Sequence, residues 1–239
     1  MRAVRRFAVQ GREPSAEVTG VRPHPSSQLV LVDFGELRAQ LITELGSIYR
    51  QQGMVHVPIS LLPPEALKAL EKAIESVKPR LSLHSRIQRT VLHQIFHSDT
   101  DRLADTHESP ECMGHRGLLP LLSALCGKSL EPHDFRGIKI QDGGFILPHT
   151  DYDAKSQIEI TLLWKPEPYD EHPLLVIPNG LRYGEYSPVQ YGGDFAIAIM
   201  GGMMHQVEEQ IGRERYSAAM TYHAKVPSSA PYPIGCPLT

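Results

Sequence analysis

The second half of the chain consists of short runs of alternating apolar and polar residues, with no helical stretch between them. Turn-forming Gly, Pro, Asn and Asp residues separate the runs, as they do consecutive strands. The runs cover residues 136–141, 145–151, 158–164, 174–177, 195–199, 203–207 and 215–223. Closely spaced strands without intervening helices bury their apolar faces against one another, so this half predicts an antiparallel sandwich or barrel.

The first half has a different period, in which apolar residues recur every three or four positions. Four stretches fit helices on this criterion, residues 34–49, 63–77, 83–96 and 118–125, and residues 53–58 fit one short strand. We expect a single domain over residues 1–239. Within it we expect an extended arm (1–28), a mainly helical support (29–133), a strand-rich core (134–226) and an extended tail (227–239).

Charge and cysteine content argue against several kinds of partner and site. The 239 residues carry 24 Lys and Arg against 27 Asp and Glu, a net charge of −3, so the chain has no polybasic field for nucleic acid or an anionic membrane. No apolar run approaches the ~18 residues of a membrane-spanning helix. Three widely spaced cysteines, Cys112, Cys126 and Cys236, indicate neither a disulfide framework nor a thiolate zinc site. We expect a cytoplasmic protein that binds neither nucleic acid nor membrane.

Two candidate metal ligands, His149 and Asp151, lie two positions apart at the end of an expected strand. Side chains at i and i+2 of a strand point to the same face, so one strand can offer both to one ion. With 12 His and 27 acidic residues in 239, chance alone produces about 1.4 such pairs. A second pair, His97 and Asp99, is indeed present.

The residues that follow distinguish the first pair from the second. His205 comes after 53 intervening residues, Arg215 lies ten positions later, and Ser217 completes an Arg-x-Ser run. Pairing His97 and Asp99 with any later histidine leaves no Arg-x-Ser at such a spacing. That pair also lies at the end of an expected helix, where side chains at i and i+2 point apart.

The ordered set His149, Asp151, His205, Arg215 and Ser217 resembles the signature of the Fe(II)- and 2-oxoglutarate-dependent dioxygenases. The resemblance covers about residues 134–226. It implies an α+β fold, a double-stranded β-helix (jelly-roll, cupin-like) barrel with N-terminal helices packed on one sheet. It also implies catalytic Fe(II) held by the two histidines and Asp151, with 2-oxoglutarate on Arg215 and Ser217, and O2 as oxidant. The implied activity is hydroxylation of an aliphatic C–H bond of a small molecule, an amino acid or natural-product intermediate, with release of succinate and CO2.

The chemistry of these residue types agrees with that resemblance. Two imidazoles and one carboxylate form a facial triad that suits Fe(II) and leaves coordination positions open. A planar guanidinium can grip a carboxylate in a fork, and Ser217 adds a hydroxyl donor on the same strand face. Small Ala219 and Thr221 continue that face, whereas Tyr216, Met220 and Tyr222 point the other way.

Other functions remain open at this point. A peptide or protein hydroxylase, an oxidase that needs no 2-oxoglutarate, and a non-catalytic, metal-free binding protein on the same barrel all fit the strand pattern. Nucleic-acid demethylases of the family carry a second arginine where this chain has Thr221, prolyl hydroxylases usually have lysine in place of Arg215, and halogenating members lack the carboxylate that Asp151 supplies.

Residues for substrate binding are less sharply indicated. Arg86 and Arg89 form a basic stripe with His93 and His97 on the expected helix 83–96, either a solvent face or a face toward an anionic substrate. Lys139 and Gln141 share one strand face and either reach the metal cavity or lie in solvent. Trp164 either lines the mouth or belongs to the core. The oligomeric state is not predicted.

Overall fold

The computed structural model describes residues 34–80, 90–97, 110–152, 157–167, 173–177 and 185–225. All of them belong to one unit that spans residues 34–239. The expected arm (1–28), the tail (227–239) and the pair Arg86 and Arg89 lie outside the described residues. Among the described helices, none is both long enough and apolar enough to cross a bilayer.

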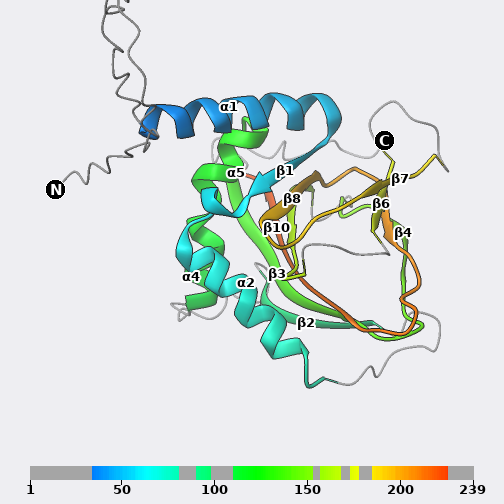
Figure 1. The fold of residues 1–239 in the computed structure, drawn as a ribbon. Coiled ribbons are helices and arrows are strands. Elements are labelled where there is room, and N and C mark those ends of the chain that lie inside the picture. Colours follow the sequence, from blue (N-terminus) through cyan, green and yellow to red (C-terminus); the bar gives the residue numbers. More distant parts are fainter. Residues whose placement is uncertain are drawn as a thin grey trace, which may run out of the picture. The chain divides into compact units, whose positions relative to one another are not determined.

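A six-stranded antiparallel sheet lies at the centre of the described unit (Figure 1). Its strands in spatial order are β1 (Met54–Pro58), β8 (Phe195–Met200), β5 (Ile158–Trp164), β10 (Arg215–Ala224), β3 (Leu130–Ile140) and β2 (Thr90–His97). A smaller sheet contains β4 (Ile146–His149), β9 (His205–Val207), β6 (Leu174–Val176) and β7 (Ser187–Val189). The prediction of packed antiparallel strands in the second half is therefore confirmed.

Helices cover one face of the large sheet (Figure 1). They are α1 (Phe34–Gln52), α2 (Pro64–Val77), α4 (Pro110–Gly117) and α5 (Leu119–Cys126), with a short 3-10 helix at Ile59–Leu61. Helix α2 begins at a proline, which a first helical turn tolerates. Its buried residues recur at helical spacing: Ala66, Ala69, Leu70, Ala73, Ile74 and Val77. Apart from Val77, this stripe packs with the helix-side residues of β5, β10 and β3 in one apolar core.

The contact between α2 and β3 is close because β3 has a glycine there. A Cβ atom on Gly137 would lie 2.2 Å from the carbonyl oxygen of Ala73 and 3.3 Å from Cβ of Val77. Only a residue without a side chain lets the helix backbone approach the strand to this distance.

The other face of the large sheet packs against the small sheet. Ile138 and Leu163 from the large sheet share a second apolar core with Leu174, Val176 and Val207 from the small one. Alternation along β10 separates the two cores, because Ala218, Met220 and Tyr222 belong to the helix side and Ala219 to the inter-sheet side. The faces predicted for β10 are confirmed, and the candidate site lies between the sheets.

The prediction of a helix over residues 83–96 is wrong for the part of this segment that the structure describes. Residues 90–97 form strand β2, which pairs with β3 from Thr90↔Ile140 to His97↔Asp134. Apolar residues four positions apart suggested a helix, but β-branched and aromatic residues are also frequent in this segment and favour a strand. The open edge of the long strand β3 decides between the two, because pairing there satisfies the backbone of β2.

Several boundaries also differ from expectation. Strand β3 begins at Leu130, before Pro132, and a bulge near Pro132 accommodates the missing backbone donor. Helix α4 and strand β7 were not predicted. Strand β4 ends at His149, so Asp151 lies in the bend after it and not in the strand itself.

Candidate active site

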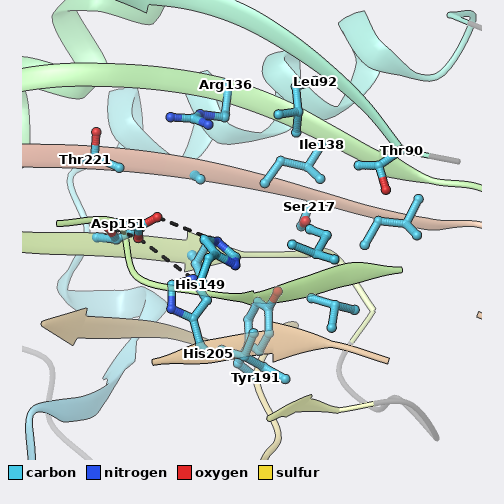
Figure 2. A pocket seen from close by; sticks show the side chains of 17 residues that line it. Thr90, Leu92, Arg136, Ile138, His149, Asp151, Tyr191, His205, Ser217 and Thr221 are labelled. Atoms are coloured by element: carbon cyan, nitrogen blue, oxygen red, sulfur yellow. Dashed lines mark hydrogen bonds and ion pairs between the residues drawn. The ribbon is translucent and has the colours of Figure 1, made fainter. Parts of the chain in front are cut away.

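Two histidines of the small sheet face each other across neighbouring strands. His149 ends β4 and His205 begins β9, and the two residues are paired in the register of these strands. Their ring centroids are 4.2 Å apart. Asp151 follows His149 by two residues, and its carboxylate oxygens lie 3.9 Å from Nε2 of each histidine. Figure 2 shows the three side chains converging on one space.

Backbone carbonyls orient both histidine rings. Nδ1 of His149 lies 2.8 Å from the carbonyl oxygen of Leu147, and Nδ1 of His205 lies 2.9 Å from that of Met203. A carbonyl oxygen only accepts hydrogen bonds, so Nδ1 is the donor in both rings, and in a neutral ring Nε2 then carries the lone pair. Metal-binding histidines are commonly held in this way.

Burial favours the uncharged form of His205. Its side chain is buried against the inter-sheet core, and desolvation lowers the pKa of the imidazole, against the opposing effect of Asp151. A neutral imidazole is the form that binds a metal ion.

A threonine of the opposite sheet holds the carboxylate. Thr161, in the middle of β5, donates a hydrogen bond from Oγ1 to Oδ2 of Asp151 at 2.5 Å. Asp151 therefore joins the two sheets at the site, although it lies beyond the end of its own strand. The candidate ligand atoms of the three residues lie within 4.8 Å of one another, and no other such group occurs in the described part of the chain. The donor set fits one divalent ion such as Fe(II).

The three residues line a cavity of about 270 Å³ between the sheets. Its walls are mostly apolar, and Leu92, Ile138, Ile140, Ile146, Leu163, Leu174, Val207 and Ala219 form them. Its other polar lining residues are Thr90, Arg136, Thr161, Tyr191, Ser217 and Thr221. A concave apolar pocket with few convergent polar groups is typical of a small-molecule site.

Arg215 lies at one end of this cavity, next to residues that line it. Its side chain is buried, and Nη2 donates a hydrogen bond to the hydroxyl of Tyr191 at 2.8 Å. The guanidinium carbon lies 5.4 Å from the centre of the Tyr191 ring. Ser217, two residues along β10, faces the cavity. This end thus brings one guanidinium and two hydroxyl groups together in a buried place, an arrangement suited to a carboxylate.

Three sequence-based candidates for substrate binding do not line the cavity. Lys139 lies on the opposite face of β3, where its Nζ donates to the carbonyl oxygen of Lys78 at 3.1 Å and lies 3.0 Å from Oε1 of Glu214. Gln141 follows the end of β3 and is also absent from the lining. Trp164 belongs to the helix-side core and donates from Nε1 to the carbonyl oxygen of Gly193. The alternation of β3 and β5 accounts for Lys139 and Trp164.

Sequence reasoning missed Thr161, Tyr191 and Arg136 as lining residues. Thr161 and Arg136 belong to expected strands, but which strand lies opposite which is not visible in a single sequence. Tyr191 precedes Gly192 and Gly193 in an irregular segment and carries no motif. Side-chain alternation along the strands could have found two of these residues, as it placed Ser217 on the cavity face of β10. Applied to β3 and β5, it groups Arg136 with Ile138 and Thr161 with Leu163.

The structure resembles solved structures of 2OG-Fe(II) oxygenases. A Pseudomonas putida prolyl-4-hydroxylase is 14% identical, with a TM-score of 0.55 over 77% of this chain and 100% of that one. SnoN, described as a non-heme alpha ketoglutarate dependent epimerase from nogalamycin biosynthesis, is 17% identical with a TM-score of 0.58 over 84% and 96%. It has also been solved with Fe3+, alpha ketoglutarate and nogalamycin RO.

A prolyl hydroxylase from Trichoplax adhaerens, in complex with a hypoxia inducible factor peptide fragment, is 12% identical with a TM-score of 0.58 over 81% and 94%. At such identities the likeness shows a shared fold. No protein-family model matches the chain, and no curated protein matches it significantly.

Proposed function

We propose that this protein is an Fe(II)- and 2-oxoglutarate-dependent oxygenase that hydroxylates an aliphatic C–H bond of a small molecule. The observation that carries the proposal is the convergence of His149, Asp151 and His205, with both Nε2 atoms turned toward the carboxylate. The likeness to oxygenases of this kind, among them SnoN with iron and alpha ketoglutarate, supports the choice of metal and co-substrate. In this proposal the two packed sheets form a double-stranded β-helix, of the jelly-roll or cupin-like kind.

His149, Asp151 and His205 would hold the iron on one face and leave the other positions open. The bound iron supplies the oxidising chemistry toward O2. Thr161 keeps the Asp151 carboxylate in one orientation, and the two backbone carbonyls fix the histidine rings. The protein's part is to fix the geometry of these ligands before the metal arrives.

Arg215, Ser217 and Tyr191 would bind the distal carboxylate of 2-oxoglutarate. The carboxylate of Asp151 leaves a bound Fe(II) with one net positive charge, and the dianionic co-substrate is attracted both to this charge and to the buried Arg215. The apolar walls between the two ends exclude water from the reacting groups. The overall reaction would consume 2-oxoglutarate and O2 and release succinate, CO2 and the hydroxylated product.

A small-molecule substrate fits the cavity better than a peptide does, since a site of about 270 Å³ between two sheets is concave. The structure of the Trichoplax adhaerens prolyl hydroxylase nevertheless contains a peptide on the same fold. A peptide hydroxylase is therefore a second outcome of the tests.

Metal binding tests the proposal directly. Titration with Mn(II), which does not turn over, should show one site per chain in the wild type and at least about 100-fold weaker binding in His205→Ala, His149→Ala and Asp151→Ala. His223→Ala is the matched control, because this histidine pairs with Glu131 outside the cavity. Unchanged Mn(II) affinity in His205→Ala would refute the metal site.

Co-substrate binding and turnover complete the test. The Mn(II)-loaded protein should bind 2-oxoglutarate. The Fe(II)-loaded protein should release succinate, and at least one member of a panel of amino acids and natural-product intermediates should increase the rate of release. Stimulation by peptides alone would replace the small-molecule proposal with a peptide hydroxylase. Binding of neither Mn(II) nor 2-oxoglutarate would leave a non-catalytic binding protein.

A further inference from the structure

A second arginine lies in the cavity, far from Arg215. Arg136 belongs to the same face of β3 as Ile138 and Ile140, and all three line the cavity. Arg215 pairs with Ile140 in the sheet register. Arg136 is four residues from that position along β3, a distance of about 13 Å at the usual rise of a strand. The backbones of the two arginines therefore lie toward different ends of the cavity.

The guanidinium of Arg136 lies at about the same position along the strands as the candidate metal ligands. It forms an ion pair with Asp134, which is paired in the register with Thr221. Thr221 is in turn paired with Thr161, the residue that holds Asp151. Asp134 and Thr161 are thus two strand spacings apart, about 10 Å. Figure 2 shows Arg136 and Thr221 on one side of the space that His149 and Asp151 face.

The ion pair fixes Arg136 without enclosing it. The side chain of Asp134 is 3% exposed, whereas that of Arg136 is 35% exposed. A guanidinium is planar and has five N–H donors, so a carboxylate on one edge leaves another edge for a second acceptor. Held by a buried partner, the group loses little conformational entropy when it binds an anion.

The wall beside Arg136 is apolar and partly open to solvent. Leu92 on β2 lines the cavity, pairs with Ile138, and is 53% exposed. An exposed leucine next to a half-buried arginine at a cavity suits a ligand with an apolar body and one negative group.

We propose that Arg136 binds the carboxylate of the substrate, and that the substrate is a small acid with an apolar body. The acid group lies on the β3 side, and the apolar body lies against Leu92 and Ile138, across the cavity from the candidate metal ligands. This inference rests on the proposed function and adds the substrate class to it. It assigns to Arg136 the anion recognition that the sequence suggested for Arg86 and Arg89.

The test compares acids with their neutral amides on the Mn(II)-loaded protein saturated with 2-oxoglutarate, which fills the Arg215 end. The probes are octanoate, cyclohexanecarboxylate and 3-phenylpropionate, each paired with its amide, in calorimetric titrations. In the wild type at least one acid should bind 10-fold or more tightly than its amide. In Arg136→Gln this ratio should fall below about 3-fold, and Arg136→Lys should retain part of it.

Two further variants keep the test decisive. Arg116→Gln removes an exposed arginine of α4 outside the cavity and should leave the ratio unchanged. If Arg136→Gln unfolds because Asp134 loses its partner, the double variant Arg136→Gln/Asp134→Asn is used in its place. The double variant removes both charges, so that no unpaired carboxylate is left buried.

The possible failures are distinguishable. A wild type that binds 2-oxoglutarate but prefers none of the three acids overturns the role of Arg136 alone. A preference for the acid that survives in Arg136→Gln overturns that role as well. A wild type that does not bind 2-oxoglutarate overturns the proposed function, and this inference with it.

Discussion

Arg215 and Tyr191 form a buried hydrogen bond of 2.8 Å from Nη2 to the phenolic oxygen, although 24 positions separate them in the chain. Arg215 comes from the start of β10, whereas Tyr191 lies in the segment between β7 and β8. The contact places a hydroxyl of the cavity lining directly on the cation proposed to bind 2-oxoglutarate. Tyr191 therefore orients Arg215 and can bind the same carboxylate.

Both residues should matter for co-substrate affinity. Arg215→Lys should weaken 2-oxoglutarate binding to the Mn(II)-loaded protein at least about 10-fold, because a point charge does not reproduce the planar fork. Tyr191→Phe should weaken it by about 10-fold through loss of one hydrogen bond to a charged group. Calorimetry measures both, and Tyr216→Phe on the opposite face of β10 is the control. If all three variants bind 2-oxoglutarate with the affinity of the wild type, this end of the cavity does not bind the co-substrate.

Thr161 should control metal affinity without being a ligand. Thr161→Val keeps the side-chain shape but removes the hydrogen bond to Asp151, so Mn(II) should bind about 10- to 100-fold more weakly. Thr221→Val is a matched control, since the hydroxyl of Thr221 donates to the backbone oxygen of Asp134 instead. If both variants bind Mn(II) as the wild type does, the carboxylate does not need Thr161.

A buried histidine should make the fold sensitive to acid. His115 is fully buried and stacks on Tyr222, with ring centroids 4.6 Å apart. Burial, together with nearby Arg116, lowers the pKa of this imidazole to about 3. Below about pH 6.5 the unfolded chain binds a proton that the folded chain does not bind. The free energy of unfolding should therefore decrease, by at most about 1.4 kcal/mol per pH unit, as the pH falls toward 3.

Urea unfolding at pH 7, 5.5 and 4.5 measures this effect. In His115→Phe the stability should depend less on pH over this range than in the wild type. His56→Phe, which changes an exposed histidine, should keep the wild-type dependence. Parallel curves for His115→Phe and the wild type would show that His115 does not carry the acid sensitivity.

Gly137 should be intolerant of any side chain. Gly137→Ala places a methyl group against the Ala73 carbonyl, so α2 must move away from β3, and the free energy of unfolding should fall by about 2 kcal/mol or more. Gly202→Ala is the control, because a Cβ atom there meets no atom within 4 Å. Denaturant unfolding compares the two, and equal stability would contradict the close approach.

The strand-rich half could be predicted because its evidence is local. Alternation along residues 158–164 and 215–223 matches β5 and β10 almost residue for residue. The order of His149, Asp151 and His205 selected three residues that the fold brings within 4.8 Å. Segment 90–97 shows the limit of such evidence. Its apolar spacing is compatible with helix and strand, and only the edge of β3 makes it a strand.

The sequence alone thus determined where most strands of the second half lie and which face of β10 meets the cavity, since the alternation of a strand can be read from neighbouring residues. The tertiary structure decided that Thr161 supports Asp151, that Tyr191 supports Arg215, and that Arg136 lies at the same position along the strands as the candidate metal ligands. The first two contacts join residues that are 10 and 24 positions apart in the chain, and all three relationships involve different strands or loops. These relationships depend on strand order and register. Pairing across the whole sheet sets both, and neither can be read from the local sequence around the residues involved.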